Sequence, residues 1–304
     1  MMLSFIIVNY NTKNLLKRLL LSIKKYFKDV EIIVIDNASG DGSQAMVKSD
    51  FPSVNLIPNT ENKGFAYANN QAMAIAQGDV FVLINSDAEL IDNSIVSAAE
   101  TVQAHQDYGL VGCRLLNSDG SVQISVGRFP GIAYAFLSNT GLGVLLPSLR
   151  RGTALAGSYF DYTHLSQVDW VMGACMILRK DVYLRVGGLN TDYFMFGEDM
   201  EWCYRIKQAG YKIVYLPDTS ITHHFNKSRS SLAAERFLLM YKNYYAFCNK
   251  YLGRKRTFII RLFNILGLTL RYAAFKSHLI RSNDVFLMYW FSNFGKALRA
   301  QFKS

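Results

Sequence analysis

Residues 31–43 read Glu31-Ile-Ile-Val-Ile-Asp-Asn-Ala-Ser-Gly-Asp-Gly-Ser43, an apolar run that ends in a cluster of turn-forming residues. Such a run predicts a strand covered on both faces, and the polar residues after it predict a loop. The pattern recurs at Phe5–Val8 and Val80–Ile84, and apolar residues at helical spacing follow the first run between residues 15 and 23. Buried strands that alternate with helices predict a parallel sheet with helices on both faces.

Polar residues come directly after three of these predicted strands. They are Asn9, Asp36 and Asp87. In open α/β sheets, ligands bind in the crevice outside the carboxyl ends of the strands. Asp and Asn also cap helices, so each residue alone is ambiguous. The three together favour a binding site at this edge of the sheet.

The composition is that of a folded protein. The chain has 304 residues, of which 50% are hydrophobic and 18% are charged, which excludes disordered, collagenous and low-complexity proteins. The four cysteines lie far apart and form no C-x-x-C pair, so neither a zinc ribbon nor a thioredoxin motif is present. We expect four reduced thiols in a reducing compartment.

The last quarter of the chain carries the net charge. Residues 232–304 contain 13 Lys/Arg and 2 Asp/Glu, a net of +11, whereas the remaining residues have a net of −1. This asymmetry predicts an anionic partner. The segment is also rich in apolar and aromatic residues, which favours an anionic membrane surface over nucleic acid. A helical subdomain with a basic face is the alternative.

The same segment predicts amphipathic helices that lie in the membrane interface without crossing it, with aromatic residues at helical spacing on the membrane face, such as Phe237, Tyr241, Tyr244 and Phe247. The best candidate for a transmembrane helix, residues 257–275, contains Arg261, Asn264 and Arg271, whereas membrane spans are nearly uncharged. The apolar run at residues 3–8 lacks the basic region and cleavage site of a signal peptide. We therefore expect a cytoplasmic protein, bound peripherally to the inner face of the cell membrane.

An apolar stretch and an acidic stretch in the second half of the chain are candidate parts of the active site. Residues 132–151 are apolar and Gly-rich, which fits a loop over the active site, a second membrane-touching segment or a buried helix. Residues 197–205 contain Glu198, Asp199 and Glu201 among aromatic residues. Arg205 can pair with Glu201 at i+4, which leaves Glu198 and Asp199 facing the preceding loop. A carboxylate kept ionised beside a substrate hydroxyl is the simplest general base.

Seven stretches, in order along residues 3–230, resemble the family 2 glycosyltransferases with the GT-A fold, in the rhamnosyltransferase-like branch. They are Ile6–Asn11, Val34–Ser43, Asn62–Asn70, Asn85–Asp87, Gly173–Ala174, Gly197–Arg205, and His223–His224 with Ser228. The resemblance implies a mostly parallel central sheet with helices on both faces, followed by a C-terminal helical extension. The expected parts are a nucleotide-sugar half at 1–110, an acceptor and catalytic half at 111–230, and a membrane-associating tail at 231–304.

The resemblance also implies roles for single residues. Asp36 matches the carboxylate that accepts a hydrogen bond from the imide N–H of uracil or thymine, a donor that cytosine lacks. Asp199 matches the general base. The remaining donor-side residues are Asn9, Asn62, Gly64 and Asp87. The residues assigned to the acceptor are Gly173, Glu198 and Trp202.

The implied metal site departs from the usual pattern. Asn85-Ser86-Asp87 occupies the position of the D-x-D signature with Asn in place of the first Asp, so Asp87 alone of this motif is expected to bind metal. His223 matches the distant histidine that completes the site, and the adjacent His224 stays an alternative. These residues imply Mg²⁺ or Mn²⁺, which stabilises a diphosphate leaving group.

The resemblance implies an inverting glycosyltransferase that uses a dTDP- or UDP-sugar, with rhamnose as the preferred sugar. The expected acceptor is a hydroxyl of a lipid-linked saccharide in cell-surface polysaccharide synthesis, and nucleic acid is not an expected partner. Galactosyl, galactofuranosyl or N-acetylhexosaminyl transfer is the alternative. A nucleotidyltransferase would need a Gly-rich triphosphate loop, whereas Asn9–Lys13 contains no glycine. A non-catalytic binding module would not need Asp87, Asp199 and His223.

Overall fold

The structure is a computed structural model that describes residues 1–224, 233–277, 295, 298 and 301. The chain divides into two compact units. The first contains Met1–Gly127 and Asp161–Asn226, and the second contains Arg128–Phe160 and the described part of Lys227–Ser304. The predicted division at residues 110 and 230 concerns function, and it stays a prediction.

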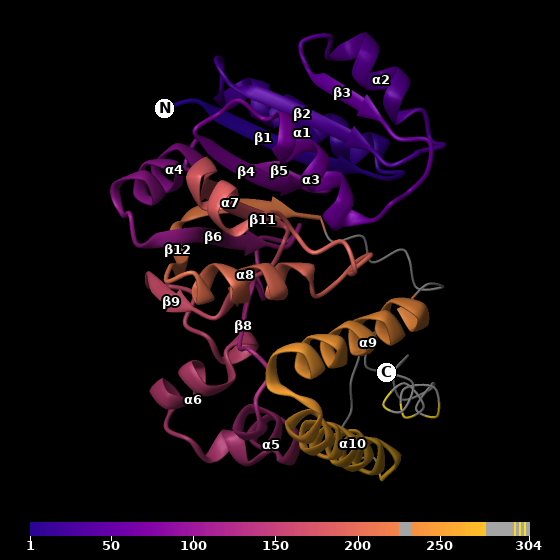
Figure 1. Cartoon of the computed structure of the whole chain (residues 1–304), viewed down its shortest axis with the longest axis vertical. Helices are drawn as coiled ribbons and strands as arrows, with labels where there is room; N and C mark the ends of the chain where they lie inside the picture. Colours follow the sequence, from indigo (N-terminus) through magenta and orange to yellow (C-terminus); the bar gives the residue numbers. More distant parts are fainter. Residues whose placement is uncertain (225–232, 278–294, 296–297, 299–300, 302–304) are drawn as a thin grey trace. The chain divides into compact units, whose positions relative to one another are not determined.

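The first unit is built on a mixed sheet whose strands run in the order β3-β2-β1-β4-β11-β6-β12-β5, with β7 beside β6 and β9 beside β12 (Figure 1). The strands of this sheet are β1 (Leu3–Asn9), β2 (Glu31–Asp36), β3 (Asn55–Pro58), β4 (Val80–Asn85), β5 (Ala88–Leu90), β6 (Tyr108–Leu116), β7 (Val122–Gln123), β9 (Ser166–Val168), β11 (Cys175–Arg179) and β12 (Lys212–His223). A separate pair joins β8 (Val126–Gly127) to β10 (Trp170–Val171).

The nucleotide half has the predicted parallel arrangement. Strands β1, β2, β3 and β4 pair in parallel, and β6 pairs in parallel with β12. Strand β11 runs antiparallel to β4 and β6, and β5 runs antiparallel to β12. The sheet is therefore mostly parallel in its first half and mixed in its second, as the GT-A expectation requires.

Helices cover both faces of this sheet. They are α1 (Lys13–Tyr26), α2 (Ser43–Asp50), α3 (Phe65–Ile75), α4 (Ile95–Ala104), α7 (Lys180–Val186) and α8 (Glu198–Gln208). Phe5 and Ile7 of β1 share one apolar cluster with residues of α1, α2 and α4. Because side chains alternate along a strand, Ile6 faces the opposite side, where α3 contacts β1 and β2. Burial on both faces explains why the strands are continuously apolar.

The second unit is helical. Its elements are α5 (Ile132–Thr140), a 3₁₀ turn at Leu142–Leu145, α6 (Ser148–Leu155), a 3₁₀ turn at Gly157–Tyr159, α9 (Ala233–Leu252) and α10 (Arg254–Lys276). Helices α5 and α10 lie side by side, and α9 packs on α10 (Figure 1). The stretch 132–151, whose structure the sequence left open, is thus helical and belongs with the C-terminal helices. The helices predicted beyond residue 232 are confirmed up to Ser277.

Two aromatic side chains of α9 are buried within the second unit. Tyr245 and Phe247 have no exposed surface, so these side chains form part of the core of the second unit. Phe247 was predicted to belong to the membrane face, and its burial shows that this assignment is wrong. The side chain of Phe237 and residues 278–294 lie outside the described residues.

All four cysteines are free and buried, as the absence of paired motifs predicted.

Within the part of the chain that the structure describes, one helix, α10, is long and apolar enough to cross a bilayer by length and composition. The expectation that no segment crosses the membrane rests on the charges of α10, and it stays a prediction.

Candidate active site

The carboxyl ends of β1 and β2 meet in register, with Asn9 opposite Asp36. The Asn9 amide donates hydrogen bonds to Asp36 Oδ2 at 2.7 Å and to Ser39 Oγ at 3.0 Å. Its Oδ1 accepts a hydrogen bond from Thr12 Oγ1 at 2.6 Å. Asn9 has no exposed surface and all its polar atoms are used, so it positions Asp36 and the following loop.

Asp36 is fully buried at the start of that loop. Its Oδ1 accepts hydrogen bonds from the Ser39 backbone N–H at 2.9 Å and from Gln44 Nε2 at 2.7 Å. A carboxylate offers about four acceptor positions, and the protein occupies three of them. The predicted hydrogen bond from a pyrimidine imide needs the one that is left, and this role of Asp36 stays a prediction.

The loop before α3 is bound to two other loops of the first unit. Asn62 Oδ1 accepts a hydrogen bond from Gly64 N at 3.0 Å, and Asn37 Nδ2 donates to Gly64 O at 3.2 Å. Gly64 has φ +87°, and a Cβ there would lie 2.4 Å from Phe194 O. Phe65 N donates to the same carbonyl at 3.0 Å. Only glycine satisfies both the positive φ and this close approach.

Asp87 follows β4 and faces His223. The distance between Asp87 Oδ1 and His223 Nε2 is 3.2 Å, and His223 Nδ1 lies 2.7 Å from Gln123 Oε1. The pairing of β12 with β5 sets His223 opposite Ala88, which brings the two side chains together. Burial opposes ionisation of Asp87, but the hydrogen bond and charge of His223 outweigh it and hold the pKa of Asp87 below its ordinary value.

The Asp87–His223 pair fits a divalent cation. Neighbouring ligand atoms of an octahedral Mg²⁺ lie about 3 Å apart, because each is ~2.1 Å from the ion. A cation would take the place of the proton between His223 Nε2 and Asp87; the ring hydrogen would then be on Nδ1, which faces Gln123 Oε1, and Asn85 Nδ2 lies 3.3 Å from the same Nε2. No group of three His, Cys, Asp or Glu side chains able to hold a metal occurs among the described residues. Among the described residues, Asp87 and His223 are therefore the two side chains that would hold the ion.

The geometry favours His223 over His224. His224 Nε2 lies 3.0 Å from Glu89 Oε2, and its Nδ1 lies 2.9 Å from Ser118 Oγ. Both ring nitrogens of His224 are therefore engaged with groups other than Asp87.

Asp199 lies in the first turn of α8. Its Oδ2 accepts a hydrogen bond from Gly173 N at 3.1 Å, and its Oδ1 accepts one from Met200 N at 2.8 Å. Burial raises the pKa of Asp199 above its ordinary value, and hydrogen bonds from Met200 and Gly173 partly oppose the rise. The residue keeps some exposed surface. A reachable carboxylate with a raised pKa has the properties of a general base.

The preceding residue, Glu198, has a different environment. It is 5% exposed, and its buried Oε2 has no hydrogen-bond partner. Burial, together with repulsion from Asp199, raises the pKa of Glu198 well above its ordinary value. Burial and the neighbouring carboxylate therefore both favour the protonated form of Glu198, and its predicted contact with the acceptor stays a prediction.

The segment 173–174 links the Asp199 site to the end of β4. The Ala174 carbonyl accepts a hydrogen bond from Asn85 N at 3.0 Å. A Cβ on Gly173 would lie 3.4 Å from Phe65 Cε1 and 3.6 Å from Asp199 Cβ. Gly173 is therefore flanked by the start of α3 and by the candidate base, which fits its assignment to the substrate site.

Two residues of α8 have structural roles. The predicted pair is confirmed, because Arg205 Nε donates to Glu201 Oε2 at 2.8 Å and Glu201 is fully buried. Trp202 was assigned to the acceptor, but it has no exposed surface and its indole N–H donates to the Gly187 carbonyl at 2.8 Å. This hydrogen bond gives Trp202 a structural role in the packing of α8, and its predicted contact with the acceptor stays a prediction.

Two contributors to the site were not found from the sequence. Gln123 orients His223 across 100 residues of chain, and the Phe194 carbonyl fixes the loop at Gly64. Neither residue belongs to a motif, and both act through contacts that only the folded sheet creates. No signal in a single sequence identifies them.

Two known rhamnosyltransferases are similar to most of this chain. The chain resembles an N-acetylglucosaminyl-diphospho-decaprenol L-rhamnosyltransferase of Mycobacterium tuberculosis, with 26% identity over 257 residues that cover 81% of this chain and 83% of the relative. It also resembles the rhamnosyltransferase WbbL of Escherichia coli, with 25% identity over 86% of this chain and 97% of the relative.

Solved structures share the fold. A mannosyltransferase of Pyrobaculum calidifontis in complex with GDP-Man and Mn²⁺ aligns with a TM-score of 0.63 and 18% identity, over 99% of this chain and 86% of that chain. GalNAc-T7 with UDP, GalNAc and Mn²⁺ aligns with a TM-score of 0.55 and 16% identity, over 74% of this chain and 43% of that chain. At these identities the likeness shows the fold alone.

The family model described as glycosyl transferase family 2 matches residues 4–168, more than half of the chain. The matched region contains the predicted donor residues, from Asn9 to Asp87. The fold agrees with that of solved glycosyltransferases, and the first unit brings the predicted base and metal residues to one region. The chain belongs to glycosyl transferase family 2 and is a glycosyltransferase.

Proposed function

We propose that the protein transfers a rhamnosyl group from a dTDP- or UDP-sugar to a hydroxyl of a lipid-linked saccharide, with inversion at the anomeric carbon. One observation carries the proposal. Asp199 accepts a hydrogen bond from Gly173, and the adjacent Ala174 is bonded to Asn85, two residues before Asp87. A candidate base and a candidate metal pair are thereby joined through one short segment at the carboxyl end of β4.

The donor would lie along the ends of β1, β2 and β4. In this proposal, the remaining acceptor position of Asp36 binds the imide N–H of the base, which uracil and thymine both offer. The loop at Asn62 and Gly64 borders the donor, and Asp87 and His223 hold Mg²⁺ or Mn²⁺. When bound, this ion stabilises the negative charge that develops on the departing diphosphate.

Asp199 would act on the acceptor. Its carboxylate takes the proton from the acceptor hydroxyl, and the hydroxyl oxygen forms a bond to the anomeric carbon. The bond from that carbon to the diphosphate oxygen breaks, and the nucleoside diphosphate leaves with the electron pair. A single displacement of this kind inverts the anomeric centre and needs no protein nucleophile.

The relatives support the choice of sugar and acceptor. The Mycobacterium tuberculosis relative is named for transferring L-rhamnose to an N-acetylglucosaminyl-diphospho-decaprenol, and the Escherichia coli relative is a rhamnosyltransferase. A lipid-linked acceptor agrees with the basic, apolar C-terminal segment. We therefore propose peripheral attachment to the cytoplasmic face of the cell membrane. Galactosyl, galactofuranosyl or N-acetylhexosaminyl transfer is the alternative for the sugar.

The decisive experiment is a screen of the purified protein against dTDP- and UDP-sugars, with release of free nucleoside diphosphate as the readout. We expect the strongest signal with dTDP-rhamnose and its loss in EDTA. Asp87→Ala and His223→Ala should each weaken the response to added Mn²⁺, whereas His224→Ala is the matched control and should not. Full activity in EDTA would overturn the metal assignment, and no release from any of these sugars would overturn the proposed donor class.

A further inference from the structure

Helix α10 exposes an apolar stripe along one side. Four of its exposed residues are spaced four positions apart, and a fifth follows the first of them: Phe258 (60% exposed), Leu262 (50%), Leu266 (43%), Leu270 (48%) and Ile259 (38%). At 100° per residue, these five positions fall within about a third of the helix circumference. We call this set the α10 stripe. Contiguous exposed apolar surface of this kind marks an interaction site.

The opposite side of α10 is fixed by packing within the second unit. Asn264 is largely buried, where it accepts a hydrogen bond from Asn139 of α5 at 2.8 Å and donates one to Tyr245 of α9 at 2.9 Å. A Cβ on Gly267 would lie 2.4 Å from Asn139 Oδ1, so α5 approaches the helix closely there. The α10 stripe is therefore not the side that builds the core of this unit.

The apolar surface continues from α10 onto α5. The rings of Phe136 and Phe263 pack edge to face, with centroids 5.3 Å apart. Phe136 and Ile132, one turn apart on α5, are each 37% exposed. Residues from two distant parts of the sequence thus form one face, which the sequence alone did not join.

The charges of α10 indicate the partner. The helix carries six basic residues and no acidic one: Arg254, Lys255, Arg256, Arg261, Arg271 and Lys276. On the helical wheel, Lys255 and Lys276 fall in the sector of the stripe, one at each end of it. An apolar strip with a cation at each end matches the interface of an anionic bilayer, where acyl chains lie below phosphate groups.

We infer that the α10 stripe, extended by Phe136 and Ile132, is the face on which the protein docks to an anionic lipid surface, with α10 parallel to the membrane plane. The choice of a membrane as partner rests on the proposed lipid-linked acceptor. The one-sided distribution favours an interfacial helix, because a spanning helix would place Arg261 and Arg271 in hydrocarbon. The same face would hold the enzyme at the surface where such acceptors lie.

The test uses the full-length protein and sedimentation with mixed phosphatidylglycerol–phosphatidylcholine vesicles. Leu262→Ser removes an apolar side chain from the stripe, and Leu21→Ser on α1 is the matched control, because these leucines are 50% and 52% exposed. We expect Leu262→Ser to partition about tenfold more weakly than the parent, as loss of one buried leucine predicts, and Leu21→Ser to match the parent. Lys255→Glu should weaken vesicle binding, and its control Lys28→Glu should weaken vesicle binding less. Added salt should weaken vesicle binding of the parent protein.

Several outcomes would overturn the inference. One is equal partitioning of Leu262→Ser and the parent. A second is self-association that Leu262→Ser abolishes, which would assign the stripe to a second copy of the chain. A third is a difference in bilayer depth between fluorescent labels at Phe258→Cys and Leu270→Cys, which would show that α10 crosses the membrane. UDP and dTDP binding, measured on the same samples, separates failure of this inference from failure of the proposed function or of folding.

Discussion

The most direct test at the residue scale concerns the candidate base. Asp199→Asn keeps the size of the side chain and removes its basicity, and its amide oxygen can still accept one of the two hydrogen bonds that Gly173 and Met200 donate to the two carboxylate oxygens. We expect transfer to fall by about 10²-fold or more. Donor affinity should change little, because Asp199 acts on the acceptor. Glycosyl transfer and calorimetric donor binding would be measured in parallel, and near-normal transfer would show that another group is the base.

Glu198 permits a prediction about pH and stability. Its pKa is raised in the folded state above its ordinary value of 4.5, so the folded protein binds more protons than the unfolded chain between these two pKa values. The free energy of unfolding therefore falls as pH rises through this window, and the full penalty applies above the folded-state pKa. Glu198→Gln removes this titration. Relative to the parent, the variant should gain stability at pH 8 and not at pH 4 in urea unfolding, and the same change at both pH values would contradict the assignment.

The residues of the site differ in how far the sequence could predict them. Asp199 stands in an acidic run among aromatic residues, and Asp36 and Asp87 follow buried strands, so pattern alone pointed to them. Trp202 shares the same run, but a side chain on the core face of α8 is not distinguished from one on the loop face by its neighbours in sequence. The partner of His223 is supplied by a strand 100 residues away.

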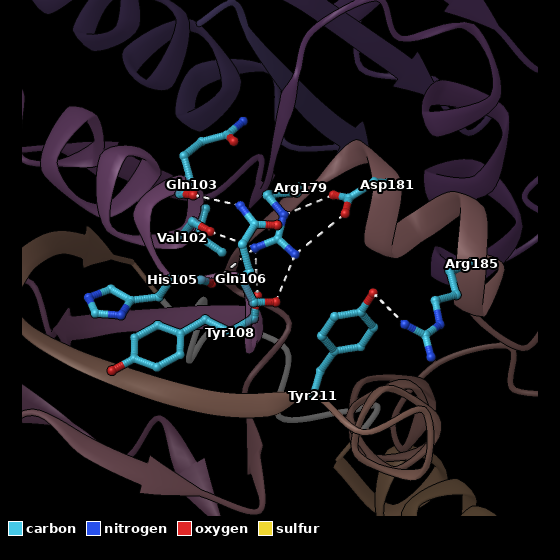
Figure 2. A network of polar contacts seen from close by, with 9 residues as sticks. All are labelled: Val102, Gln103, His105, Gln106, Tyr108, Arg179, Asp181, Arg185 and Tyr211. Carbon is cyan, nitrogen blue, oxygen red and sulfur yellow. Dashed lines mark hydrogen bonds and ion pairs between the residues drawn. The ribbon is translucent and has the colours of Figure 1, made fainter.

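At the scale of elements, Arg179 shows how the C-terminal end of α4 is held (Figure 2). Its guanidinium donates hydrogen bonds to the carbonyls of Val102, His105 and Tyr108, at 2.7, 3.1 and 3.1 Å, and to that of Gln106 at 3.2 Å. Arg179 is 3% exposed. One cation thus binds the Val102 carbonyl in the last turn of α4 together with three carbonyls of the chain that follows this helix.

Arg179→Met should therefore lower the free energy of unfolding by about 3 kcal/mol, because buried carbonyls lose charge-assisted hydrogen bonds. Arg185→Met is the matched control: Arg185 is exposed, donates a hydrogen bond to the Tyr211 hydroxyl (Figure 2) and lies over the Tyr211 ring, so we expect a change within about 0.5 kcal/mol. Arg179 is opposite Val80, at the end of β4 away from Asn85, so donor affinity of the folded variant should be unchanged. Equal losses in the two variants under urea denaturation would refute this account.

The predicted elements were correct where burial on both faces makes a strand continuously apolar, as in β1, β2 and β4. The apolar run at residues 168–178 is divided into β10 and β11, and the sequence does not show the break because Met172, Gly173 and Ala174 lack polar side chains as well. Strand β12 was not predicted. Pro217 and Asp218 interrupt its apolar pattern, and the pairing with β6 shifts register between Leu216 and Ser220, where such residues are tolerated.

At the scale of the whole molecule, every predicted site residue lies in the first unit, and the proposed docking face lies in the second. Removal of the residues beyond Ser231 takes away α9 and α10 but keeps α5, which packs on α10. Phe136 would lose the ring of Phe263, and Asn139 would lose its hydrogen bond to Asn264. We expect this truncated protein to aggregate.

A variant that removes the second unit completely should behave differently. It ends at residue 226 and replaces residues 128–160 by a short Gly-Ser linker between two segments that stay bonded to the first unit, because Ser125 O accepts from Met172 N at 2.8 Å and Tyr162 O accepts from the Tyr215 hydroxyl at 3.0 Å. The sheet, the Asp36 loop, Asp87, His223 and Asp199 are all retained, so we expect UDP or dTDP to bind with an affinity close to that of the full-length protein, and binding to anionic vesicles to be lost. Calorimetry and vesicle sedimentation measure the two properties separately. Loss of nucleotide binding in a folded variant would show that the donor site needs the second unit, and retained vesicle binding would place a membrane contact on the first.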